Sequence, residues 1–154
     1  MADSKEMFKL KNIVLGLPKE TSDEAILRCG KMLVDGGYAG QEYVEGMLAR
    51  DHSFSCGIGN FIAIPHGEKE YKQYVQSAGI VVLVYPDAID WHGVPVNLVI
   101  GIAARGEEHL DILGNVVDNI DSGDDVLKLV TKNSREAIYD MFCGGSGGRS
   151  GDGR

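Results

Sequence analysis

Hydrophobic and polar positions change their period several times along the chain, which predicts alternating helices and strands. Thr21 and Glu24 form a capping box, and the apolar residues after it recur at helical spacing up to Gly36. The same spacing predicts a second helix over residues 41–50. Residues 79–84 are nearly all apolar or β-branched, as expected for a strand that is buried on both faces.

The remaining elements continue this alternation. A short strand over 61–64 precedes a short polar helix over 68–76, and residues 96–103 predict a second buried strand. Tyr85–Pro95 is rich in turn residues and predicts a connection between strands. Three further helices are expected over residues 107–121, 124–132 and 134–142. This order of elements favours a single α/β domain whose central sheet has helices on both faces.

The composition of the chain predicts where the domain ends and argues against several classes of function. Residues 144–154 contain six glycines and no apolar side chain, so we expect a flexible Gly/Ser-rich tail after a domain formed by residues 1–143. The 154-residue chain carries a net charge of −8 and has no cluster of Lys and Arg. Such an acidic chain is not expected to bind nucleic acid or anionic membranes, because both require basic patches.

The N-terminal segment and the cysteines predict the compartment. Met1–Leu10 is charged and lacks the hydrophobic region of a signal peptide. The longest apolar runs are too short and interrupted to span a bilayer. Cys29, Cys56 and Cys143 have no Cys-x-x-Cys spacing and fit free thiols. We therefore expect a cytoplasmic protein without direct membrane insertion.

A lone histidine at the end of a short strand is the first candidate for chemistry. Pro65 precedes His66 and stiffens the corner, while Gly67 after it allows a sharp turn or the close approach of a ligand. The helix expected from Glu68 onward would place backbone N–H groups beside an anion. This arrangement suits a histidine that accepts a phosphoryl group, although an ordinary surface turn would also account for it.

Two more side chains are candidates for the same site. His109 follows the strand at 96–103, so it lies at the same edge of the sheet as His66 if the two strands are neighbours. Arg50 ends the second helix and offers planar, bidentate donors to phosphate. The plainer alternatives are that Arg50 caps its own helix and that His109 is a solvated helix residue. His52 and His92 lie in polar segments and are assigned no role.

Other chemistries have weaker support in the sequence. His66, Glu108 and His109 could together bind zinc, but the usual ligand spacings are absent. Ser53 and Ser55 are candidate nucleophiles that lack a Gly-x-Ser-x-Gly elbow. No Walker loop or Gly-x-Gly-x-x-Gly segment precedes a helix, so nucleotide binding is not indicated.

Three separated segments resemble one family. Gly59–Gly67 resembles the phosphorylation-site signature of the mannitol/fructose class of enzyme IIA of the bacterial phosphotransferase system. Asp35–Tyr38 and residues 42–50 are similar to the helical region that precedes this signature, and residues 100–110 are similar to the segment that carries the family's second histidine. The segments occur in the matching order, and the mannitol branch is the closest in likeness.

The resemblance implies a fold and a role. The fold is one α/β domain with a mixed, largely parallel five-stranded sheet between helices. The role is that of a phosphocarrier without a metal or cofactor, in which phospho-HPr phosphorylates His66 and His66 passes the group to a cysteine of a separate enzyme IIB. His109 would hydrogen-bond the phosphoryl group or His66, and Arg50 would offset its charge.

Two further expectations concern partners. A small apolar docking surface should surround the site. Its candidates are Phe61, Ile62 and the aliphatic residues near His109, some of which are expected to belong to the core. The alternative function is that of a regulatory, nitrogen-related enzyme IIA, whose phosphorylation state controls its binding to target proteins. The His66 signature alone does not separate the two functions, whereas His109 and the mannitol-like flanks favour sugar transport.

Overall fold

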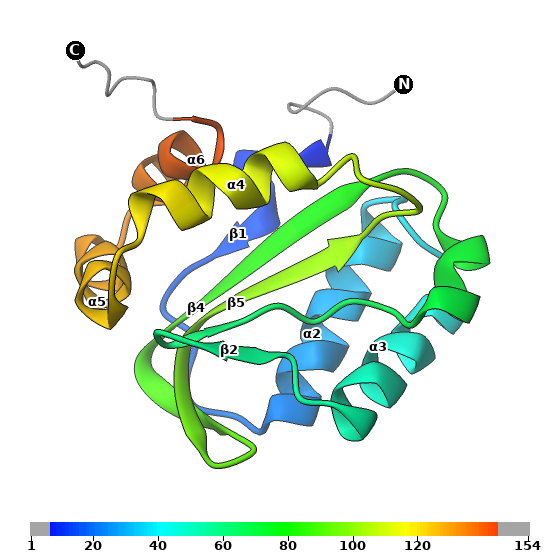
Figure 1. Ribbon diagram of the computed structural model, residues 1–154, viewed down its shortest axis with the longest axis horizontal. Helices are drawn as coiled ribbons and strands as arrows, with labels where there is room; N and C mark the ends of the chain where they lie inside the picture. The colour runs from blue at the N-terminus through cyan, green and yellow to red at the C-terminus, as the bar shows by residue number, and fades with distance from the viewer. Residues whose placement is uncertain (1–6, 145–154) are drawn as a thin grey trace.

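The central feature of the fold is one five-stranded sheet with strand order β1-β4-β5-β3-β2. The computed structural model describes residues 7–144, and Figure 1 shows the sheet between two groups of helices. The strands are β1 (Ile13–Val14), β2 (Gly57–Gly59), β3 (Ile62–Ala63), β4 (Gly79–Trp91) and β5 (Val94–Ala103). Within the described residues, no helix is long and apolar enough to cross a membrane.

The sheet is mixed in equal parts. β1 runs parallel to β4 and β3 runs parallel to β5, whereas β4–β5 and β2–β3 are antiparallel. The expectation of a five-stranded mixed sheet is confirmed, but the expectation that it is largely parallel is wrong. The reason is the hairpin formed by the two longest strands, which can be antiparallel neighbours because a two-residue turn joins them.

That hairpin also corrects the expected connection at Tyr85–Pro95. β4 continues to Trp91 and β5 begins at Val94, so the only residues between them are His92 and Gly93. Both have positive φ, at 52° and 94°, which suits the tight turn of a β-hairpin. Pro86 and Asp87 therefore lie at an irregularity in the strand pairing, and Gly93 lies at the turn. Asp90 and Pro95 pair with each other across the two strands, so the segment contains no long loop.

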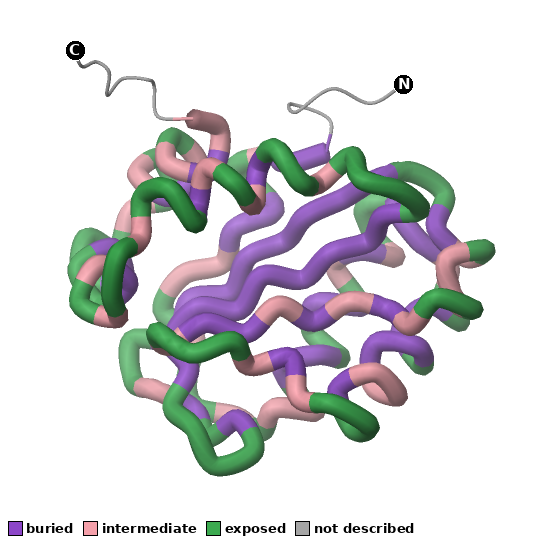
Figure 2. The backbone as a smooth tube through the Cα atoms, viewed as in Figure 1, coloured by how far each residue is buried: buried purple, intermediate pink, exposed green. Residues whose placement is uncertain are grey.

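Helices cover both faces of the sheet, as the sequence predicts. α2 (Ser22–Asp35) and α3 (Gln41–Ser53) pack on one face, and α4 (Leu110–Asn119), α5 (Gly123–Lys132) and α6 (Arg135–Phe142) pack on the other. Successive residues of β4 alternate between the two cores: Ile80 and Val82 face the α4–α6 side, and Val81 and Leu83 face the α2–α3 side. The β4–β5 pair is accordingly the most deeply buried part of the fold, as Figure 2 shows.

The helix boundaries differ from the prediction mainly at the two segments next to the site. The capping box at Thr21 is present. The polar helix expected at 68–76 is a shorter 3-10 helix, η2 (Lys69–Tyr74), and the helix expected from 107 begins at Leu110. A short 3-10 helix, η1 (Leu10–Asn12), precedes β1. Of the tail expected at 144–154, residues 145–154 lie outside the described residues, as do residues 1–6.

The sheet brings the two candidate histidines to the same edge. β3 and β5 are parallel neighbours, and His66 continues this pairing through an isolated bridge to Ile102. The backbone N–H of Ile102 donates to the carbonyl of Pro65 at 3.0 Å, which extends the contact to the corner itself. His109 follows the end of β5 as the N-cap residue of α4. The strands before these histidines are therefore neighbours, which is the condition under which the sequence places both histidines at one edge.

Candidate active site

The ring of His66 is held by its own backbone. Its Nδ1 lies 2.8 Å from the carbonyl oxygen of Ile64, and since a carbonyl can only accept, Nδ1 carries the proton. In this tautomer Nε2 keeps its lone pair. Such a bond fixes the orientation of the ring and leaves one nucleophilic nitrogen. The partner that determines the tautomer could not be identified from the sequence.

Tyr43 fastens the His66 corner to the sheet. Its buried hydroxyl donates to the carbonyl of Ile102 at 2.8 Å and accepts from the N–H of Gly67 at 2.9 Å. A Cβ at residue 67 would lie 2.4 Å from the Tyr43 ring, so glycine permits this close approach. The helical spacing of residues 41–50 predicts only that Tyr43 faces the core, because nothing in that spacing indicates where its hydroxyl points.

We expect Tyr43→Phe to loosen this corner. Loss of the Tyr43 hydroxyl leaves the buried N–H of Gly67 and the buried carbonyl of Ile102 without their shared partner. This should lower the free energy of unfolding by about 1–3 kcal/mol. Urea denaturation measures the change, with Tyr74→Phe as the control, because Tyr74 packs against the same core. Equal stability of Tyr43→Phe and the wild type would contradict this role.

His109 faces the same pocket as a neutral ring. Burial lowers its pKa, and the positive charge of Lys72 lowers it further, against the opposing effect of Glu108. Its Nδ1 is buried and has no hydrogen-bond partner within residues 7–144. A neutral imidazole that is not fully bonded to the protein can donate its one N–H to an anion in the pocket.

Arg50 lies at the C-terminal end of α3, and the structure supports both interpretations given for it. Its Nη1 donates to the carbonyl of Phe54, the C-cap residue of α3, and its guanidinium lies 5.1 Å from the centre of the Phe54 ring. Arg50 therefore caps its helix. It also lines the pocket that contains His66 and His109.

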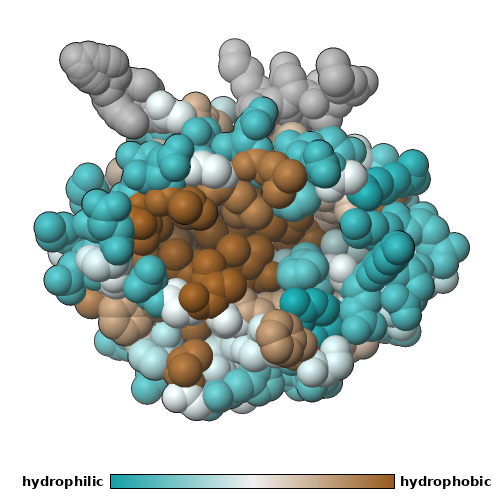
Figure 3. Space-filling view, in the orientation of Figure 1, coloured by the Kyte–Doolittle hydropathy of each residue, from teal (hydrophilic) through white to brown (hydrophobic). Residues whose placement is uncertain are grey.

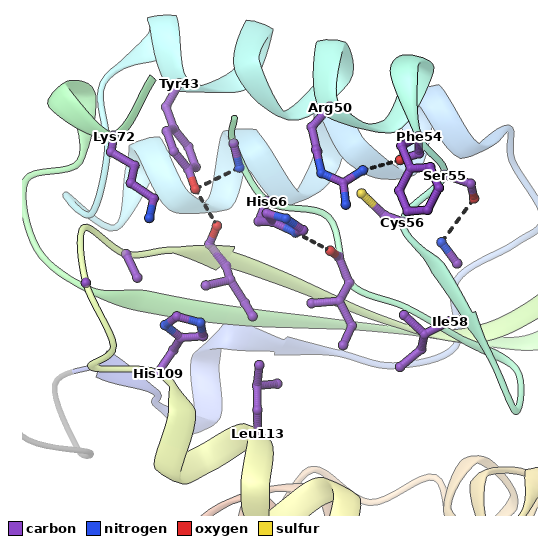
Figure 4. Close-up of a pocket in the computed structure, with 16 residues that line it drawn as sticks. Tyr43, Arg50, Phe54, Ser55, Cys56, Ile58, His66, Lys72, His109 and Leu113 are labelled. Carbon is purple, nitrogen blue, oxygen red and sulfur yellow. Dashed lines mark hydrogen bonds between the residues drawn. The ribbon is translucent and has the colours of Figure 1, made fainter. Parts of the chain in front are cut away.

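The three predicted site residues share one pocket of about 380 Å³. Figure 4 shows Arg50 on α3, His66 after β3 and His109 before α4 converging on it, with Lys72 of η2 beside Tyr43. Among the described residues that line the pocket, the permanent cations are Arg50 and Lys72, and none is Asp or Glu. In a chain of net charge −8, this wall selects for an anion. Lys72 was not predicted as a site residue from the sequence, because η2 carries no regular helical pattern that would show which of its side chains face the pocket.

A buried carboxylate supports the loop between Arg50 and the pocket. Asp51 accepts hydrogen bonds from the N–H of Cys56 at 2.9 Å, from Trp91 Nε1 at 2.9 Å and from His92 Nε2 at 2.6 Å. Burial raises its pKa, but these three donors outweigh burial and hold the pKa below its usual range. His92, which was assigned no role, thus links the β4–β5 turn to the wall of the pocket.

The pocket opens onto an apolar face. Figure 3 shows a broad hydrophobic area in the middle of the molecule, between α4 and β2. Ile58 of β2, which is exposed, and Leu113 of α4 line the pocket on this side. Of the docking residues expected from the sequence, Phe61 is partly buried and Ile62 is buried in the core. Ile62 is thus one of the candidates that belong to the core, and it is not part of an exposed surface.

The remaining candidates are not grouped into a second site. Ser53 donates to the carbonyl of Arg50 and to Glu68, at the end of its helix. His52 forms an exposed pair with Asp23 of α2. Within residues 7–144, no group of three or more His, Cys, Asp and Glu side chains is placed to hold a metal ion.

The fold and the site define a class of protein: a single α/β domain with one anion-selecting pocket, into which two histidines and two permanent cations project. The family described as "Phosphoenolpyruvate-dependent sugar phosphotransferase system, EIIA 2" matches residues 6–143. The chain belongs to this family, and it is a phosphotransferase component of such a system.

Individual relatives agree with this assignment over nearly their whole length. The chain is 36% identical over 135 residues to the mannitol-specific phosphotransferase enzyme IIA component of Halalkalibacterium halodurans, covering 88% of this chain and 93% of that protein. The corresponding protein of Staphylococcus aureus is 36% identical over 137 residues, covering 89% and 95%. The structure superposes on Escherichia coli enzyme IIA-mannitol, solved in complex with phosphorylated enzyme IIB-mannitol, with a TM-score of 0.79 and 34% identity, covering 89% and 99%.

Proposed function

We propose that this protein is a phosphocarrier that takes a phosphoryl group from phospho-HPr on His66 and passes it to a cysteine of enzyme IIB for mannitol uptake. The observation that carries the proposal is the 2.8 Å bond from His66 Nδ1 to the Ile64 carbonyl. This bond leaves Nε2 as the nucleophile in a pocket lined by cations. A neutral imidazole with a free ring nitrogen is the form of histidine that can attack phosphorus.

The transfer needs in-line attack and little other covalent work. The lone pair of His66 Nε2 forms the new P–N bond, while the donor nitrogen keeps the electron pair of the bond that breaks. The Nδ1 proton stays on His66 and remains bonded to the Ile64 carbonyl. In the onward step the P–N bond breaks, its electron pair returns to Nε2, and the cysteine thiolate of the acceptor forms the P–S bond. The protein's share of the work is to position the group and compensate its charge.

Charge compensation comes from side chains that already face the pocket. A phosphoryl group carries nearly two negative charges. Arg50 supplies a permanent positive charge, and the neutral His109 supplies an N–H donor. A set of donors this small suits a carrier, because the group must leave His66 again and a deeper basic pocket would retain it.

The partners follow from the relatives and from the apolar face. Enzyme IIB-mannitol is the partner in the solved complex of the Escherichia coli relative, and the two curated relatives are named mannitol-specific. The apolar side chains of α4 and β2 beside the pocket suit a small, transient interface for HPr and for enzyme IIB.

A reconstituted relay tests this function. Purified protein is mixed with labelled phosphoenolpyruvate, enzyme I and HPr, and then with the IIB component of a mannitol transporter. We expect acid-labile label on this protein that moves to IIB when IIB is added. Label that accumulates without moving to IIB would instead favour the regulatory alternative.

We expect His109→Ala to separate the two halves of the relay. The variant should still accept phosphate from phospho-HPr, because His66 and its tautomer are intact, but it should pass the group to IIB about 10- to 100-fold more slowly. Single-turnover transfer of the label to IIB measures this rate. Unimpaired transfer would remove His109 from the mechanism.

A further inference from the structure

Lys72 is the one lysine that lines the His66 pocket within the described residues. It lies on η2, about a turn after the exposed Lys69, and is itself partly buried. Figure 4 shows its side chain reaching from η2 toward the space between His66 and His109. In the same view, Arg50 lies on the other side of the His66 ring, so the two cations flank the nucleophile.

The backbone that carries Lys72 is fixed at both ends. Tyr71 packs against Gly46 of α3 so closely that a Cβ at residue 46 would lie 2.3 Å from its ring. Val75 is bridged to Ala39, and its carbonyl accepts a hydrogen bond from Arg105 at 2.8 Å. Lys72 therefore starts from an anchored segment, and its side chain is directed at the pocket.

The ammonium group of Lys72 is not engaged by another side chain or by the backbone. Across residues 7–144 it forms no ion pair and no hydrogen bond, whereas Arg50 already donates to the carbonyl of Phe54. Its positive charge nevertheless contributes to lowering the pKa of His109, after the larger effect of burial. Lys72 is thus close enough to His109 for its charge to favour the neutral form of that ring.

We propose that Lys72 is a direct ligand of the phosphoryl group on His66 and supplies the charge compensation that Arg50, bonded to its own helix end, provides only in part. The inference rests on the proposed phosphocarrier function. Lys72 stays protonated throughout, and it donates N–H groups to the phosphoryl oxygens without exchanging a proton with them. No acidic side chain among the described pocket residues competes for it.

Three variants test the proposal in the full chain: Lys72→Met, Lys72→Arg and the control Lys69→Met from the same short helix. We expect Lys72→Met to accept phosphate from phospho-HPr about 10- to 100-fold more slowly and to shift the phosphoryl equilibrium toward HPr by about 10-fold. Lys72→Arg should recover most of both losses, because it keeps the charge. Lys69→Met should behave as the wild type does.

Salt and the titration of His109 distinguish a ligand from other roles. The deficit of Lys72→Met should persist at about 0.5 M salt, where long-range steering of an encounter is screened. By NMR, the pKa of His109 in the unphosphorylated protein should rise in Lys72→Met and not in Lys69→Met, which a purely structural role would not produce.

Specific results would overturn the proposal. They are a Lys72→Met variant within twofold of the wild type, an equal loss in Lys69→Met, a deficit that disappears in salt, or an unchanged pKa of His109. If the wild type takes no label at all, the proposed function fails together with this inference. A labelled wild type with an equally active Lys72→Met variant removes only the role of Lys72.

Discussion

Replacing His66 by glutamine is expected to abolish phosphorylation of this protein by phospho-HPr. Glutamine keeps the size and some of the hydrogen bonding of the side chain but offers no nucleophilic lone pair comparable to that of imidazole. Loss of a nucleophile lowers the rate of covalent catalysis on the order of 10⁶-fold, which here is below detection. The measurement is the initial rate of acid-labile labelling in the presence of enzyme I and HPr.

The fold should survive this change, so the loss can be assigned to chemistry. His66 is partly exposed, and the corner around it is held by Tyr43 through Ile102 and Gly67, not by the imidazole alone. The control is His52→Gln, a histidine exposed on α3 and paired with Asp23, which should be labelled like the wild type. Label that persists in the His66 variant would contradict the assignment of the nucleophile.

Removing the carboxylate of Asp51 is expected to have the largest effect on stability. Asp51 is 1% exposed and accepts three hydrogen bonds that join α3, the loop at Cys56 and the β4–β5 turn. Asp51→Ala leaves these donors buried without a partner and should lower the free energy of unfolding by about 3 kcal/mol. It should also slow phosphoryl transfer, because the loop at Cys56 lines the pocket beside Arg50.

Urea denaturation of a matched pair of variants isolates the contribution of burial. Asp23 and His52 form a similar Asp–His pair, but the side chain of Asp23 is 51% exposed. Asp23→Ala should therefore change stability by no more than about 0.5 kcal/mol. Equal effects of the two substitutions on stability would contradict the account.

The contribution of Asp51 to stability also depends on pH. Because the pKa of Asp51 is held below its ordinary value of 3.8, this contribution is fully present above that pH and is lost as the pH falls through the lowered pKa.

The groups that carry the proposed chemistry were predictable because each follows a strong local pattern. His66 lies between a proline and a glycine at the end of an apolar run, and His109 follows a second apolar run. Strands of this kind are buried and adjacent in an α/β sheet, so the residues that follow them meet at one edge. The burial of β4 and β5 and the capping box at Thr21 were predictable for the same reason.

The supporting residues were not predictable because their roles depend on distant contacts. Tyr43 lies on α3 at a position whose spacing indicates only that it faces the core, and Asp51 lies one residue beyond the helix predicted over 41–50. Their polar atoms are bonded to β5 and to the β4–β5 turn, 59 and 41 residues away in the chain. The length of the hairpin was missed, since Pro86, Asp87 and Asp90 resemble loop residues although β4 contains them. Tertiary pairing overrides local propensity in such a strand.

The most direct test of the central claim is to locate the phosphoryl group on the phosphorylated protein by phosphorus and nitrogen NMR of the histidine rings. The bond from His66 Nδ1 to the Ile64 carbonyl leaves only Nε2 free to react. We expect a single phosphohistidine, at His66, with phosphorus bonded to Nε2 and the proton retained on Nδ1. Phosphorus bonded to Nδ1 of His66, or to His109 or any other residue, would contradict the account.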